Sequence, residues 1–109
     1  MKKIRILVDA HVFDGEFQGT RTFIKEIYSL LSTYEGLEIY LAAYDIENLK
    51  KTFHSFPLLK FIKYRTKSTF IRLLWDIPAI IKSNKIDYVH FQYIVSPIKT
   101  CKYIVTIHD

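Results

Sequence analysis

Short apolar runs alternate along the chain with longer segments of helical spacing. The runs are rich in β-branched and aromatic residues and show little polar alternation, which is typical of strands buried on both faces of a parallel sheet. They predict five strands, at Lys3–Val8, Leu37–Ala43, Leu59–Tyr64, Ile86–Phe91 and Tyr103–Ile107.

Three of the segments between these runs carry apolar residues at steps of three and four, as in a helix with one buried face. The sequence offers start signals for them at Thr20 or Thr22, at Asp45 and at Ser68. Gly36 follows the first segment, where a left-handed residue commonly closes a helix. Pro78 lies inside the third and predicts a kink, or two short helices with Asp76 capping the second.

The regular alternation of strand and helix predicts the α/β class. Right-handed βαβ units give a Rossmann-like, doubly wound parallel sheet of about five strands in the order 3-2-1-4-5, with helices on both faces. The connection between residues 91 and 101 is the exception, since it is short and has no helical period.

Composition limits the chain to a single domain. Its 109 residues are 50% hydrophobic and 16% aromatic, enough for a substantial core. The single cysteine, Cys101, excludes an internal disulfide and fits a reducing compartment. Arg5 and Asp9 interrupt the first apolar run too early for a signal peptide, and no window reaches the roughly 20 apolar residues of a membrane span. We therefore expect a cytoplasmic protein.

Polar residues follow three of the predicted strands. Asp9 follows the first, while His90 and His108 lie near the ends of the fourth and fifth. The carboxyl ends of parallel strands share one edge, and ligands bind there where the strand order reverses, between the first and fourth strands. We expect these residues to border one cleft, with Tyr93 lining it. A lone histidine at a strand end is more often structural, and two at adjacent ends shift that balance.

The loop from Asp14 to Arg21 opens the first helix beside this cleft. Gly19 would let a ligand approach the backbone N–H groups, whose positive dipole favours phosphate, and Thr20 and Arg21 would add a hydroxyl and a charge. The alternative, that Gly15 and Gly19 only serve turns, has about even weight. The dinucleotide fingerprint with three close glycines is absent, which disfavours a dehydrogenase.

Four stretches together carry a family resemblance, and they lie at residues 6–15, 17–23, 87–93 and 105–109. They resemble retaining glycosyltransferases of family four, which have the two-domain GT-B architecture. The resemblance implies that residues 1–109 form the amino-terminal, acceptor-side Rossmann-like domain. It also implies that Gly19, Thr20 and Arg21 lie near the donor phosphates and acceptor, that His108 contacts the donor sugar as the catalytic residue, and that His90 matches a position of varying role.

The implied activity is transfer of a sugar, with retention of configuration, from a UDP- or GDP-linked hexose to a glycan or lipid-linked acceptor. No metal or other cofactor is expected. Many family members carry a double glycine where this chain has Gln18-Gly19, which weakens the case for tight phosphate contact. The nucleotide-sugar domain of such enzymes would follow Asp109, so we expect the 109 residues alone to be inactive and to associate as a twofold dimer.

Two other readings stay open. The first is a non-catalytic nucleotide- or phosphate-binding module of flavodoxin-like shape. The second is a nucleic-acid binder, because the segment from Lys50 to Arg72 has seven cations, no acid and interleaved aromatic residues. No motif for reading bases accompanies it, so it ranks third and no nucleic acid is expected. The same segment predicts peripheral contact with an anionic membrane at its inner face.

Overall fold

A computed structural model describes residues 3–14, 18–92 and 95–106, with backbone alone at residues 12 and 18–20. Its sheet has five parallel strands in the order β3-β2-β1-β4-β5, so the predicted class and strand order are confirmed. The strands are β1 (Ile4–Asp9), β2 (Leu37–Ala43), β3 (Lys60–Lys63), β4 (Tyr88–Gln92) and β5 (Lys102–Thr106).

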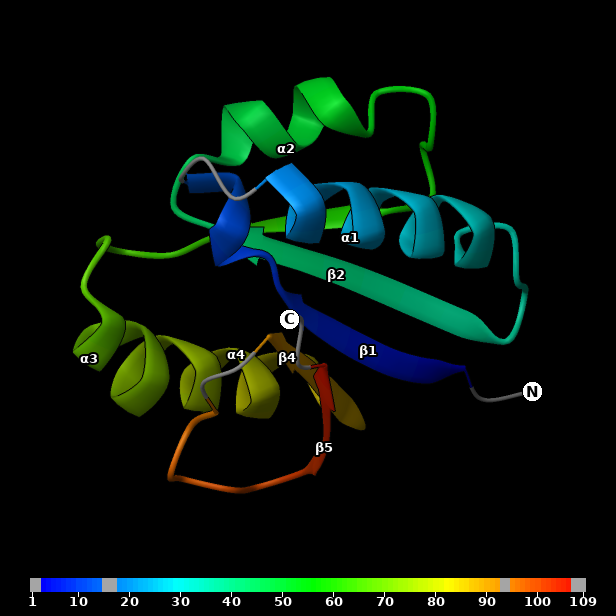
Figure 1. Ribbon diagram of the computed structural model, residues 1–109. Coiled ribbons are helices and arrows are strands. Elements are labelled where there is room, and N and C mark those ends of the chain that lie inside the picture. The colour runs from blue at the N-terminus through cyan, green and yellow to red at the C-terminus, as the bar shows by residue number, and fades with distance from the viewer. Residues whose placement is uncertain (1–2, 15–17, 93–94, 107–109) are drawn as a thin grey trace.

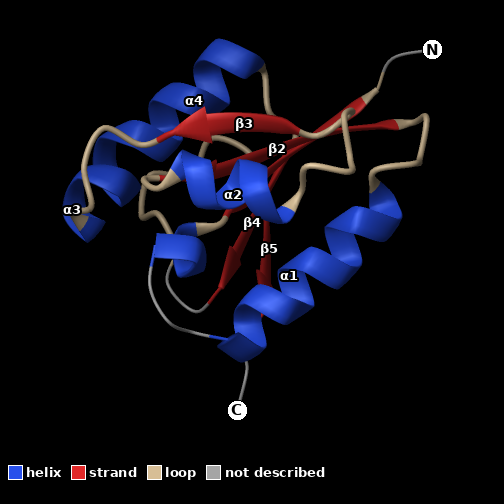
Figure 2. Ribbon diagram, turned by 90° about the horizontal axis from the view of Figure 1, so that it is seen from above, coloured by secondary structure: helices blue, strands red, loops and turns tan. Residues whose placement is uncertain are grey.

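Helices cover both faces of this sheet, as Figure 1 shows and as Figure 2 shows from above. The first face carries a short 3-10 turn, η1 (His11–Asp14), and the helices α1 (Gln18–Leu31) and α2 (Ile46–Thr52). The second face carries one continuous helical segment, composed of α3 (Thr69–Ile71), η2 (Arg72–Asp76) and α4 (Ile77–Asn84).

The alternation of side chains along the strands divides the core into two clusters. Ile6 and Val8 of β1 pack on the α1 face, whereas Leu7 packs on the α4 face. Asp9 follows Leu7 by two residues and therefore lies on the α4 face. In β4, Val89 packs on the α4 face, so His90 points to α1. The two polar strand ends thus lie on opposite faces of one sheet.

The first helix differs from prediction at both ends. It begins at Gln18, so Thr20 and Thr22 lie inside it instead of capping it. It ends at Leu31, and Gly36 is not left-handed but accepts a hydrogen bond from the Ile4 N–H at 2.9 Å. Among the described residues, the one with a left-handed backbone is Lys85, at φ 52°, which closes α4. Lysine gives no sequence signal for that conformation.

Pro78 does not break the third helix. The preceding segment η2 is a π-helix, in which the Ile77 N–H bonds the Arg72 carbonyl five residues back. The wider turn lets the chain continue into α4 with Pro78 in its first turn, where the missing N–H is tolerated. Asp76 has helical backbone angles and makes no capping hydrogen bond, so its predicted role as a cap is wrong.

The β5 edge of the sheet is thinly covered. Ile104 and Val105 are both exposed, and β4 is the strand that pairs with β5. An open strand edge with apolar side chains favours association. This agrees with the predicted dimer, which stays a prediction. Among the described residues, no helix combines the length and the apolar character needed to cross a membrane.

Candidate functional site

A buried polar cluster forms where β1 ends. The Asp9 side chain has no exposed surface, and its Oδ1 accepts a hydrogen bond from the Tyr64 hydroxyl at 2.7 Å. Its Oδ2 lies 3.3 Å from Arg72 Nε and 3.4 Å from His11 Nδ1. Neither of these contacts has hydrogen-bond geometry, so the attraction is electrostatic and the three atoms remain without a hydrogen-bond partner.

The charges in this cluster stabilise one another. Burial alone would raise the pKa of the Asp9 carboxyl, but His11 and then Arg72, with the Tyr64 hydroxyl, hold it below its ordinary value. Burial, and next the charge of Asp9, raise the pKa of the Tyr64 phenol. The cluster therefore contains an ionised carboxylate and a protonated phenol, held in fixed positions at the carboxyl edge.

Arg72 and Tyr64 are members of the cluster whose roles the sequence did not reveal. Arg72 ends the basic segment that starts at Lys50, yet it is 6% exposed and points at Asp9. Its neighbours Leu73 and Ile77 face the same core. The sequence did carry one signal, which is an arginine at an inward position of the helical stripe. Arginine is almost never buried without a partner, so that position predicts a buried acidic group.

His90 lies on the other face of the sheet and joins three elements. Its Nδ1 is 2.6 Å from the Tyr28 hydroxyl of α1, and its Nε2 bonds the Thr106 hydroxyl of β5. His90 is 5% exposed, and the centre of its ring lies 6.4 Å from the centre of the Phe23 ring. Burial raises the pKa of the Tyr28 phenol, which stays protonated. This geometry suits a residue that positions α1 and β5 against β4.

Gln92 ends β4 two residues beyond His90 and is fully buried. Its Nε2 makes one long hydrogen bond, 3.4 Å to the His90 carbonyl, and its Oε1 has no partner. Among the described residues, four of the five buried side-chain atoms that lack a hydrogen-bond partner lie at the carboxyl edge, namely Asp9 Oδ2, His11 Nδ1, Arg72 Nε and Gln92 Oε1. Unsatisfied buried groups are costly and cluster where function requires them.

The other predicted site residues are placed in part. Gly19 and Thr20 lie in the first turn of α1, which contains no acidic residue, and only their backbone is described. The Arg21 guanidinium lies 5.3 Å from the centre of the Phe13 ring. Tyr93 and His108 lie outside the described residues. The structure therefore brings Asp9 and His90 to one edge, on opposite faces, and leaves their relation to His108 as a prediction.

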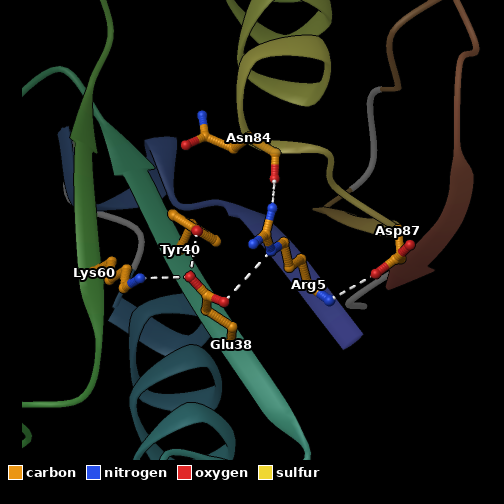
Figure 3. Close-up of polar contacts among 6 residues, drawn as sticks. All are labelled: Arg5, Glu38, Tyr40, Lys60, Asn84 and Asp87. Atoms are coloured by element: carbon orange, nitrogen blue, oxygen red, sulfur yellow. Dashed lines mark hydrogen bonds and ion pairs between the residues drawn. The ribbon is translucent and has the colours of Figure 1, made fainter. Parts of the chain in front are cut away.

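The opposite, amino edge holds a paired ion network that Figure 3 displays. Glu38 Oε1 accepts hydrogen bonds from Lys60 and from the Tyr40 hydroxyl, and Glu38 Oε2 lies 3.4 Å from Arg5 Nε. Arg5 also donates from Nη1 to the Asn84 carbonyl at 2.9 Å and from its backbone N–H to Asp87 at 2.8 Å. The hydrogen bond from Lys60, followed by that from Tyr40, lowers the pKa of Glu38 to about 2.

Two open hollows of about 490 and 480 Å³ flank this network, lined by residues that include Asp87, Lys102 and Lys60. They are larger than the hollows at the carboxyl edge, but the polar groups in the network beside them are already bonded to one another. We assign this edge a structural role, since its charges have protein partners and parallel sheets bind ligands at the carboxyl ends of their strands.

The basic segment does not form one surface. Lys50 and Lys51 lie on α2, Lys60 belongs to the amino-edge network, and Arg72 is buried. Lys63 and Lys67 both lie over the Tyr44 ring. Contact of this segment with an anionic membrane or with nucleic acid stays a prediction, and a single docking face would involve only some of its cations.

Within the described part of the chain, no group of three or more histidine, cysteine and acidic side chains could hold a metal ion. Comparison of the chain with known protein families, with curated proteins and with solved structures finds no match.

Proposed function

We propose that residues 1–109 form the acceptor-side domain of a retaining glycosyltransferase, which moves a hexose from a nucleotide-sugar to a glycan or lipid-linked acceptor. The observation that carries this proposal is the set of unsatisfied buried polar atoms at the carboxyl edge, on Asp9, His11, Arg72 and Gln92. They flank the point where the strand order reverses, between β1 and β4. Ligands of doubly wound sheets bind at that position.

The chemistry of these groups fits a sugar substrate. The His11 side chain is 25% exposed and can bond a sugar hydroxyl, while the buried Asp9 carboxylate, paired with the Arg72 guanidinium, holds it from beneath. The first turn of α1 adds the positive end of a helix dipole, which favours a donor phosphate. His108 is the proposed contact to the donor sugar, and no metal is required in this scheme.

The test starts from the reading frame downstream of the Asp109 codon. The complete gene product should transfer labelled hexose from a UDP- or GDP-hexose to an acceptor, and the product should keep the anomeric configuration of the donor. A complete product that contains no second αβ domain, or that binds nucleotide-sugars without transferring the sugar, would contradict the proposal. The second of these outcomes would support the non-catalytic nucleotide-binding module instead.

A further inference from the structure

A separate hollow at the carboxyl edge holds the only tryptophan of the chain. Its volume is about 390 Å³, and it is lined by Arg65, Thr66, Ile71 and Trp75. Its lining residues come from the loop after β3, from α3 and from η2. The helix α3 lies at the periphery of the molecule in Figures 1 and 2. The Trp75 side chain is 58% exposed. An indole left this open on a helix offers a flat apolar surface to a ligand.

Arg65 is held in place beside this indole. The buried Asp76 carboxylate accepts the Arg65 backbone N–H at 3.0 Å through Oδ2 and the Arg65 Nε–H at 2.8 Å through Oδ1. The Arg65 side chain is 68% exposed, and its two terminal nitrogens make no hydrogen bond or ion pair within the described part of the chain. Asp76 therefore fixes the guanidinium through one side and leaves its other donors available to solvent.

We propose that this hollow binds a hexose ring that carries a carboxylate, as in an acidic glycan. The apolar face of a sugar ring can stack on the Trp75 indole, as other flat apolar groups do. The free nitrogens of Arg65 match a carboxylate in a bidentate pair, for which arginine is better suited than lysine. Because Asp76 orders the guanidinium beforehand, little entropy is lost on binding.

This assignment names the acceptor class and therefore rests on the proposed function. The hollow lies on the same edge of the sheet as Asp9, beyond the end of β3, where an extended acceptor can reach both places. The geometry assigns to the hollow one of the outer units of an acceptor chain. The unit that receives the hexose would lie nearer Asp9.

A lipid bilayer is the competing partner for this surface. Phe70 is 76% exposed, and an apolar hollow of about 260 Å³ lies beside it, lined by Thr69, Leu73, Leu74 and Pro97 as well. The charge around it is mixed, because Lys67 shares a hollow with the acidic residues Asp45 and Glu47. An anionic bilayer needs a surface with several cations, which this mixed charge does not provide. A saccharide carboxylate needs only the one ordered guanidinium of Arg65 beside Trp75, so the saccharide is favoured.

The direct test is a fluorescence titration of the 109-residue chain, in which Trp75 is the only tryptophan. Trigalacturonate should change the emission in a saturable way, with a dissociation constant on the order of 1 mM. The neutral maltotriose should bind at least about tenfold more weakly, because it lacks the carboxylates that Arg65 would pair with. Vesicles of phosphatidylglycerol and of phosphatidylcholine form the third arm.

Matched variants separate the two partners. Arg65→Lys should weaken trigalacturonate binding by about tenfold, whereas Lys67→Gln, an exposed cation over the Tyr44 ring, should change it less than about twofold. In calorimetry, Trp75→Leu should abolish binding, while Phe70→Leu should leave it unchanged. Since both aromatic side chains are exposed, both variants should keep the thermal unfolding curve of the parent chain.

Three results would overturn the assignment. They are equal binding of the neutral and acidic trisaccharides, no response to trigalacturonate at about ten times the expected constant, and a response to anionic vesicles alone that Phe70→Leu removes. Saccharide binding by a chain whose complete gene product transfers no sugar would retain this site and remove the proposed function. Sugar transfer by the complete gene product without saccharide binding at the Trp75 hollow would retain the proposed function and remove this site.

Discussion

The two edges of the sheet contain similar charged residues, but these are hydrogen-bonded to one another at the amino edge and are incompletely hydrogen-bonded at the carboxyl edge. At the amino edge, Glu38 is bonded to Lys60 and Tyr40, and its charge also faces Arg5. At the carboxyl edge, Asp9 has one good hydrogen bond, and His11 and Arg72 lie close to it without hydrogen-bond geometry. The amino edge has the larger hollows, and the carboxyl edge has the more deeply buried charges.

This difference shows that open volume is a poor guide to function in this fold. Charges that already satisfy each other gain little from a ligand, whatever space lies beside them. A buried carboxylate and guanidinium held apart from ideal geometry have more to gain from a polar ligand. Substitutions at the two edges should therefore differ in size and in kind.

The largest effect is expected from Asp9→Leu. It leaves the Arg72 guanidinium buried without a counter-charge, which should lower the free energy of unfolding by about 3–5 kcal/mol. Urea denaturation followed by circular dichroism gives this value. The double variant Asp9→Leu with Arg72→Met should recover most of the loss. If the double variant is no more stable than Asp9→Leu, the two residues are not a coupled pair.

A smaller loss is expected from Tyr28→Phe on the α1 face. It removes the hydroxyl that bonds His90 Nδ1 inside the core, at a cost of about 1–3 kcal/mol. Tyr34→Phe is the matched control, because Tyr34 is also a tyrosine near the end of α1 but is exposed. Equal unfolding free energies for the two variants would show that His90 does not depend on Tyr28.

The proposed function predicts that catalysis depends on His108 and not on the amino edge. In the complete gene product, His108→Ala should lower kcat/KM for sugar transfer by at least about tenfold, roughly 1.4 kcal/mol of transition-state stabilisation. Glu38→Gln, at the amino edge, should leave kcat/KM unchanged under conditions where the protein is folded. Full activity of a folded His108→Ala enzyme would remove His108 from the site.

The smallest effect is expected from Glu38→Gln on stability. It weakens the bonds to Lys60 and Arg5 and should cost about 1 kcal/mol at neutral pH. The folded-state pKa of Glu38 is lowered from 4.5 to about 2, so the advantage of the parent chain is complete above pH 4.5 and disappears as the pH falls through about 2. A stability difference that stays constant from pH 6 to pH 2 would contradict this network, and paired acid titrations of the two proteins measure it.

Hydrophobic pattern alone predicted the sheet, because buried parallel strands such as Leu37–Ala43 leave a clear apolar signal and the connections allow few topologies. Side-chain pairing was less accessible. Arg72 is adjacent to Asp9 only because β3, η2 and β1 meet in space, and its place in a basic segment hid that contact. Pairings across 63 positions leave no mark in a single sequence.

Local backbone details were also missed for physical reasons. The π-helix η2 depends on an i to i+5 hydrogen bond that no residue type specifies. Lys85 closes α4 with a left-handed backbone that glycine usually marks, whereas Gly36, which carried that expectation for the first helix, does not adopt it. Asp9 and His90 point to opposite faces because side chains alternate along a strand and Val8, not Asp9, is the register partner of His90. That register is not readable from the sequence.

The central position of β1 has a kinetic consequence. This first strand pairs with β2 from Leu37 onward and with β4 from Tyr88 onward, so the hydrogen bonds on its β4 side wait for residues far along the chain. During synthesis β1, β2 and β3 can join early, while the other edge of β1 stays open until β4 emerges. Such distant pairing slows folding. We therefore expect a two-step order in which a three-strand intermediate, with an open apolar edge, is the species that chaperones would recognise.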